Sequence, residues 1–533
     1  MSHRSSPATT RSEVGQLLSS PAMAAALICV LLGSIDLTVV ASILPQMIGD
    51  LGVNTADIDR YIWAVNAYLV AYIVAIPLAG RTSDVFGRQA TFVGCLLVFL
   101  AGSVLCATSD TLVDLIVGRA IQGFGGGGLL PVALALAGDT LGQKSQLAGI
   151  GFVSAVETIG WILGPIYGAV VTGLLDFTDE PWRWVFWINV PMLALLVIAF
   201  RGFSKKSRQG VERSSSSRID LPGAVLLSIA LTAVNLALAS GGEFGGGTGT
   251  GIRAMGGTEN PLADRAPWLL GVAVVSSILL IAWERCSRYP LLPISLYRQG
   301  PFLATIVANL CLGGVLMVTM VNVPVVVALT ADSGNVSSLS AAMLAPFTAA
   351  IAVASLIASK AARQIGARAT MIVGIALALA GSILIAVVLD GDNIWTMTPG
   401  LLIGGAGIGL LLPALGTLPI QLAGGADRGA AASSALMFRL LGMTVGVSIL
   451  TALGVRRLQT LTGRLEPIVR EPDESTALFL TRQREFIVDH AIPLSLQVIR
   501  ETFLAAAVIA LLAAIPIAML ARYLSSDAST VDT

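Results

Sequence analysis

Apolar residues fill most of this chain in long runs that short polar stretches separate. About fourteen runs reach the roughly 20 residues that a helix needs to cross a bilayer. Gly and Pro interrupt many runs, which spanning helices tolerate. The approximate limits of the runs are 23–47, 61–79, 90–108, 112–138, 146–175, 184–201, 219–240, 267–284, 301–330, 339–359, 369–390, 397–422, 430–456 and 501–522. The pattern predicts an all-α integral membrane protein with about fourteen transmembrane helices.

Three of the polar stretches between runs are long. Residues 202–218 are basic and Ser-rich, as in a flexible linker, and residues 241–266 are Gly-rich. The third, 457–500, begins with Leu458, Leu461 and Leu465 at helical spacing. A helix running past the bilayer for about ten residues, or about 15 Å, and a segment folded onto the membrane surface both fit this pattern.

The placement of Lys and Arg predicts the orientation. Most loop Lys and Arg follow the even-numbered runs, and few lie in the opposite loops. Basic loops stay on the cytoplasmic side, so we expect a multi-pass protein of the plasma (inner) membrane with both termini cytoplasmic. The polar N-terminal tail (1–21) lacks a cleavable signal pattern, so we expect the first helix to be retained.

Composition narrows the function classes. The chain is 55% hydrophobic and 12% charged with zero net charge, whereas soluble domains carry about 25% charged residues. The zero net charge gives no indication of nucleic-acid binding. Five cysteines without CxxC spacing and two histidines outside the apolar runs give no disulfide framework, metal site or catalytic triad. The run GFGGGG around Phe124 lacks a GK[ST] ending. We expect no enzyme activity, metal or cofactor.

Asp36 is a lone carboxylate near the middle of the first run. A charge there costs about 2.5–3.5 kcal/mol on insertion scales, so it faces a protein-lined or wet interior. Protonation removes that cost. Asp36 is therefore a candidate for proton coupling or for the substrate path, and pairing with a buried Arg is the purely structural alternative.

The fourth and fifth runs hold complementary charges. Arg119 and Gln122 lie one turn apart in the fourth run, and Glu157 lies in the fifth. A buried Arg needs an acceptor, so an Arg119–Glu157 pair is one interpretation, and a titrating or substrate-facing Glu157 is the other. Small residues favour close helix approach and a proline bends a helix. In the fifth run these are Gly160, Gly164, Pro165 and Gly168.

The loop after the second run reads GRTSDVFGRQ, from Gly80 to Gln89. Gly80 and Gly87 permit tight turns at helix ends. Asp84 can approach a neighbouring helix N-terminus, and Arg88 supplies an opposite charge. These four residues predict a clasp that holds two helix bundles in one conformation. An ordinary polar turn remains the alternative.

Together these motifs resemble the major facilitator superfamily, in its fourteen-spanner drug–proton antiporter branch. The resemblance rests on the Asp-bearing first run, the GxxxDxxGR loop, RAIQG, GxxxGPxxG and WRWVFWINVP (182–191), and it covers nearly the whole chain. KAARQIGAR (360–368) resembles a degenerate repeat of the first-half loop. Thr82 and Val85 depart from the usual loop pattern, which weakens the inference about the clasp's strength.

The resemblance implies two six-helix bundles with two inserted helices and alternating access. The expected boundaries are 1–21 tail, 22–201 N-terminal bundle, 202–218 linker, 219–284 inserted helices with the external Gly-rich loop, 285–522 C-terminal bundle with the external segment 457–500, and 523–533 tail.

Four stretches carry a closer likeness: TVV after Asp36, IPLAGRTSDVFGR (76–88), LLPVALALAGD (129–139) and MVTMVNV (317–323). Through them, within that branch, the chain is similar to mycobacterial-type exporters of lipids and hydrophobic drugs. In those relatives the residues matching Asp36, Glu157 and Arg439 support proton-coupled export, and a periplasmic lipoprotein assists; the sequence leaves open whether one assists here. Asn322 stands where such relatives carry an acid, which removes one titratable group.

The leading hypothesis is a proton-driven exporter of hydrophobic small molecules or lipids. Arg439 would favour the charged form of Asp36 if the two meet. The expected hydrogen-bonding residues of an otherwise apolar cavity are Asn66, Gln122, Asn309 and Asn322. A proton-coupled uptake carrier for a specific metabolite and a non-transporting membrane sensor are the alternatives.

Overall fold

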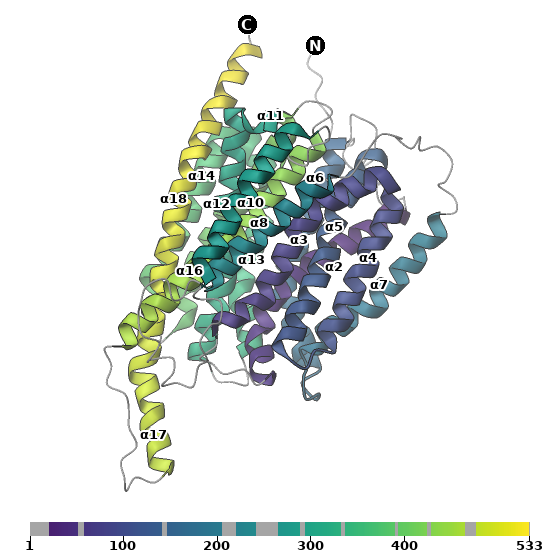
Figure 1. Ribbon diagram of the computed structural model, residues 1–533. Helices are drawn as coiled ribbons and strands as arrows, with labels where there is room; N and C mark the ends of the chain where they lie inside the picture. The colour runs from purple at the N-terminus through teal and green to yellow at the C-terminus, as the bar shows by residue number, and fades with distance from the viewer. Residues whose placement is uncertain are drawn as a thin grey trace.

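The computed structural model is a bundle of long, roughly parallel helices (Figure 1). It describes residues 21–51, 58–140, 146–204, 220–240, 265–287, 294–331, 336–389, 393–423, 428–463 and 476–531. Most of the predicted linker and of the Gly-rich loop, and nearly all of the N-terminal tail, lie outside these residues.

Each of the predicted runs coincides with a long helix. The first half contains α2 (Pro21–Asp50), α3 (Ile58–Phe86), α4 (Arg88–Ala107), α5 (Leu112–Thr140), α6 (Gln146–Leu174) and α7 (Arg183–Ser204). Then follow α8 (Leu221–Ser240), α10 (Ala266–Cys286) and the short α11 (Ile294–Tyr297). The second half contains α12 (Gly300–Thr330), α13 (Val336–Ile365), α14 (Ala367–Val388), α15 (Thr398–Leu422), α16 (Arg428–Thr462), α17 (Thr476–Phe486) and α18 (Ile492–Val531).

The helices are apolar enough to cross a membrane. Among the described residues, 10 helices hold a sufficiently long apolar window, and α6, α7 and α8 hold shorter ones. The all-helical membrane fold is thus confirmed, while the number fourteen stays a prediction. All five cysteines are free.

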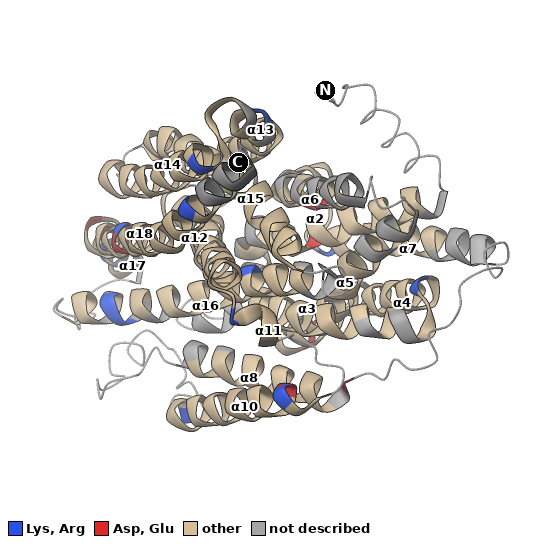
Figure 2. Ribbon diagram, turned by 90° about the horizontal axis from the view of Figure 1, so that it is seen from above, with Lys and Arg blue, Asp and Glu red and all other residues tan. Residues whose placement is uncertain are grey.

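The two halves pack as separate groups that meet along a few helices. In the first half α2 packs on α6, and α5 packs on both α3 and α4; in the second half α12 packs on α16 and α18, and α15 packs on α13 and α14. Between the halves α6 contacts α13, and α3 contacts α16. The helix α8, which pairs with α10, packs against α3 and α16, one helix from each half (Figure 2).

Two glycines mark the same bend in both halves. Gly87 (φ 91°, ψ 146°) precedes α4, and Gly366 (φ 88°, ψ 148°) precedes α14. Only glycine adopts this backbone region readily, so KAARQIGAR does repeat the first-half loop in geometry. Gly80 behaves differently from the prediction: α3 continues through it to Phe86, so only Gly87 forms a turn. Asp84 lies in the last turn of α3 and Arg88 begins α4, while the Asp84 side chain lies outside the described residues.

The end of α16, α17 and the beginning of α18 extend beyond the bundle. At about 1.5 Å per residue, the 35 residues of α16 and the 40 residues of α18 measure about 52 and 60 Å, against a hydrocarbon core of about 30 Å. Figure 1 shows α17 projecting from one end of the bundle. A π-helical turn, Ile487–Ala491, joins α17 to α18, and α18 includes residues 523–531, which the sequence assigns to a tail. We call the described residues 458–463 and 476–491 the extension.

Candidate functional site: two buried ion pairs

Asp36 forms an ion pair inside the first half. Its side chain is 1% exposed, and its Oδ2 lies 2.6 Å from Nη1 of the fully buried Arg119 on α5. Asn189 on α7 donates a hydrogen bond of 3.2 Å to Oδ1. Arg119 also donates to the backbone carbonyls of Ala64 on α3 (3.2 Å) and of Asp36 itself (3.3 Å). One cation therefore ties α2, α3 and α5 together around the carboxylate.

Polar and aromatic neighbours complete the surroundings of Arg119. Gln122 accepts from Arg119 at 2.6 Å and donates to Ser103 on α4 at 3.0 Å. The guanidinium carbon lies 4.0 Å from the centre of the Tyr68 ring, a favourable cation–π geometry. The Tyr68 hydroxyl donates to the carbonyl of Gly33, one turn before Asp36. Asp36 is thus enclosed by protein and does not face lipid.

The second pair joins the two halves. Oε1 of Glu157 on α6 lies 3.6 Å from Nη2 of Arg439 on α16, with side-chain exposures of 5% and 11%. The Arg439 guanidinium carbon lies 4.9 Å from the Trp161 ring centre. Its Nε, although buried, has no hydrogen-bond partner among the described residues.

These pairs correct two sequence interpretations. The acceptor of Arg119 is Asp36, and not Glu157. The cation beside Asp36 is Arg119, while Arg439 meets Glu157. Helical periodicity gives the face on which a residue lies but not which of two neighbouring helices that face contacts, so the sequence left the partners open.

Close packing of α6 on α2 sets the position of Glu157. A Cβ at Gly160 would lie 2.5 Å from the Cβ of Ser34, and one at Gly164 would lie 2.8 Å from the carbonyl oxygen of Ile35 and overlap the Thr38 hydroxyl. Thr38 donates to the carbonyl of Trp161 at 3.0 Å. The absence of side chains at these glycines lets the two backbones approach, as in other small-residue helix contacts. Pro165 and Gly168 are buried on the same helix.

The remaining predicted residues are dispersed. Asn66 on α3 donates to Ser448 on α16 at 3.0 Å, a second polar contact between the halves. Asn309 donates to the carbonyls of Thr305 and Leu415, and Asn322 to Thr502, so both connect helices within the second half.

Sequence reasoning missed two residues of the Asp36 network. Asn189 lies in the WRWVFWINVP motif, which we used only as a mark of family resemblance, and Tyr68 is one aromatic residue in an apolar run. A polar amide within an apolar run was the available signal for Asn189.

Comparison with known proteins assigns the family. The family model described as Major Facilitator Superfamily matches residues 26–447. The chain is 34% identical over 464 residues to a triacylglyceride transporter of Mycolicibacterium smegmatis, covering 83% of this chain and 78% of the relative. It is 31% identical over 479 residues to a probable triacylglyceride transporter of Mycobacterium leprae, covering 86% and 88%.

Solved structures share the fold. A bacterial homologue of the human lysosomal transporter Spinster, in an inward-facing conformation, matches with a TM-score of 0.60 at 13% identity, covering 95% of this chain and 97% of that one. The xylose transporter of E. coli matches with a TM-score of 0.54 at 12% identity, covering 92% and 96%. The chain belongs to the Major Facilitator Superfamily.

Proposed function

We propose that this transporter is a proton-coupled exporter of hydrophobic or amphiphilic compounds, with lipids of the triacylglyceride class as its main substrates, and that it works by alternating access. The substrate class is supported by the names of the mycobacterial relatives, which match most of this chain. Membership of a transporter superfamily supports alternating access.

The observation that carries the mechanism is the Glu157–Arg439 pair between the halves. Its separation of 3.6 Å exceeds the about 2.7–2.9 Å of a charge-assisted hydrogen bond, whereas the Asp36–Arg119 pair within one half is at 2.6 Å. The looser pair lies at the contact that rocking must change. Removing one partner from a buried ion pair costs about 3–5 kcal/mol, because the other charge is left uncompensated.

Protonation of Glu157 connects this pair to the proton gradient. A neutral Glu157 attracts Arg439 less, so proton binding favours separation of the halves around this contact. By linkage, the separated arrangement binds the proton more tightly. Arg439 keeps its stacking on Trp161, which lessens the penalty for the unpaired cation.

Asp36 has a second and distinct role in this proposal. Because Arg119 and Asn189 hold it in place and protein encloses it, it exchanges protons only when the first half opens a water path to it. We propose that it titrates in that conformation and returns to the Arg119 pair afterwards.

Transport in proteoliposomes under an imposed pH gradient tests this function. We expect the wild-type protein to move a labelled triacylglyceride and a fluorescent hydrophobic dye outward against an inward proton flow. Glu157→Gln and Asp36→Asn should lose the response to the gradient, while Asp114→Asn, which changes an exposed carboxylate at the start of α5, should retain it. Movement that ignores the gradient, or full activity in Asp36→Asn, would refute proton coupling. Uptake driven by inward protons would favour the metabolite carrier, and no transport at all would favour the sensor.

The orientation and partner belong to the same proposal. The basic loops support a plasma (inner) membrane location with cytoplasmic termini, so the extension would lie outside, in reach of a periplasmic lipoprotein. Labelling of introduced cysteines at 480 and 530 with an impermeant maleimide tests the orientation: the first should react from outside and the second only after permeabilisation.

A further inference from the structure

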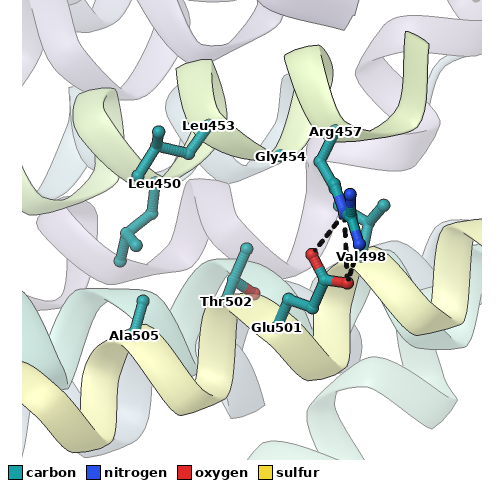
Figure 3. Close-up of a pocket in the computed structure, with 8 residues that line it drawn as sticks. All are labelled: Leu450, Leu453, Gly454, Arg457, Val498, Glu501, Thr502 and Ala505. Atoms are coloured by element: carbon teal, nitrogen blue, oxygen red, sulfur yellow. Dashed lines mark hydrogen bonds and ion pairs between the residues drawn. The ribbon is translucent and has the colours of Figure 1, made fainter. Parts of the chain in front are cut away.

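A small pocket lies between α16 and α18, where these helices leave the bundle towards the extension (Figure 3). Its volume is about 270 Å³, and its walls are Leu450, Leu453, Gly454, Arg457, Val498, Glu501, Thr502 and Ala505. On α16 the pocket begins at Leu450, about three turns beyond Arg439, so it is separate from the Glu157–Arg439 contact.

The pocket is apolar along one side and charged at one end. Leu450, Leu453 and Ala505 line the part nearer the bundle, as Figure 3 shows. Arg457 and Glu501 face each other at the end nearer the extension, with Nε–Oε2 at 2.9 Å and Nη2–Oε1 at 3.1 Å. These two side chains are 45% and 38% exposed. In the wall, Leu450 and Val498 are buried, whereas Leu453 is 53% exposed at the outer surface.

The outer surface changes character at the same level. At the end of the pocket nearer the middle of the bundle, the neighbouring residues Ile449 and Leu504 are 40% and 44% exposed. Val508, one turn further along α18, is 55% exposed. In an integral membrane protein such residues face the hydrocarbon. The ion pair then lies near the boundary between hydrocarbon and headgroups, where charged side chains with long stems prefer to be.

Size and charge limit the occupant. Sites for whole small molecules measure about 300–1,000 Å³, so this pocket accommodates one chain of a lipid and not a complete triacylglyceride. The paired charges carry no net charge and therefore give no preference for an anionic headgroup, but the exposed guanidinium can donate to a neutral ester carbonyl. The arrangement suits a neutral ester lipid, with its alkyl chain against the leucines and its ester beside Arg457.

We propose that this pocket binds one acyl chain of a neutral ester lipid at the base of the extension. It would serve as an intermediate binding site for a lipid that passes from the bilayer to the extension. This inference rests on the proposed function for its substrate class. It gives α16 and α18 a role in lipid handling that small dyes do not use.

Photolabelling tests occupancy directly. A triacylglycerol with a diazirine in one acyl chain, reconstituted with the full-length protein, should label the α16 and α18 segments that contain Leu453 and Val498. Excess unlabelled triacylglycerol should abolish the labelling, and excess phosphatidylcholine should not. Labelling that both lipids compete equally would identify ordinary bilayer lipid and overturn the proposal, as would no labelling of these segments.

A filling substitution tests function. Gly454 lines the pocket, and a Cβ there would lie 3.4 Å from Cγ1 of Val498, an ordinary contact. Gly454→Phe is therefore the substitution chosen to fill the pocket. The matched control is Gly94→Phe, at an exposed glycine of α4 with open space around it. Lipid transport should fall by about tenfold in Gly454→Phe, the effect of losing the burial of about two methylene groups, while dye export stays at the control level.

The outcomes separate this inference from the proposed function. Unchanged lipid transport in a folded Gly454→Phe protein would overturn the pocket's role. Absence of lipid transport in the wild type would instead refute the proposed substrate, and the competed photolabelling would still decide whether the pocket binds an ester lipid.

Discussion

Removal of Arg119 should destabilise the protein in a way that depends on pH. Arg119 is fully buried and holds Asp36 at 2.6 Å. Without it, Asp36 must either keep an uncompensated charge or take up a proton on folding. An unfolded Asp ionises with a pKa of about 3.9, so protonating it at pH 7 costs about 1.36 × 3.1, or about 4 kcal/mol. This value agrees with the about 3–5 kcal/mol measured for broken buried pairs.

The sign of the pH dependence follows from linkage. In Arg119→Leu the folded state binds one more proton than the unfolded state, so its stability falls as pH rises. Between pH 8 and pH 5 the penalty should shrink by about 1.4 kcal/mol per pH unit. The wild-type protein, in which Arg119 compensates the charge of Asp36, should show a shallower slope than Arg119→Leu. Denaturant unfolding in detergent at a series of pH values measures the effect.

A double-mutant cycle provides the control. Arg119→Leu combined with Asp36→Leu removes both charges, and replacing a whole buried pair with apolar residues is often nearly neutral. The double variant should therefore be more stable than Arg119→Leu alone and should lose its pH slope. A loss below about 1 kcal/mol in the single variant, within the range of an exposed pair, would refute the reasoning, and so would additive losses in the double variant.

Three further predictions concern packing, backbone and surface charge. Gly164→Val should lower stability by about 1–3 kcal/mol, because the added side chain overpacks α6 on α2. Thermal unfolding measures this loss, and Gly173→Val, at a glycine in open space, is the control. Equal losses in the two variants would contradict the close contact. Gly87→Ala and Gly366→Ala should each cost about 1–3 kcal/mol, because their backbone conformation strains other residues; unfolding midpoints equal to wild type would contradict this. Arg457→Gln should change stability by less than about 1 kcal/mol, since its ion pair is exposed; a larger shift in the denaturation midpoint would contradict it.

The sequence predicted the long helices well, but it did not predict which buried charges pair with each other. Apolar run length predicted each long helix, because a bilayer fixes how many apolar residues a helix needs. It also marked Asp36, Arg119, Glu157 and Arg439, because charges in such runs are rare. Which charges pair depends on helix tilt and rotation, which packing between helices sets. Arg119 could reach either acid on periodicity alone, and in the folded protein it meets Asp36.

Gly80 shows a similar limit at a helix end. A glycine within a polar stretch indicates a turn, yet α3 continues through Gly80. Helices tolerate a single glycine at a cost of about 1 kcal/mol. Gly87 forms the turn because its positive φ makes glycine necessary there.

The distance between the halves as a function of pH tests most directly whether protonation of Glu157 drives their separation. Spin labels at Val170 on α6 and Ile449 on α16, both exposed, can be introduced after the five native cysteines are replaced, and measured by double electron–electron resonance. Acidification should shift the wild-type population towards a second distance, while Glu157→Gln should show that distribution at every pH. Identical distributions across pH in the wild type, or an unchanged pH response in Glu157→Gln, would contradict the account.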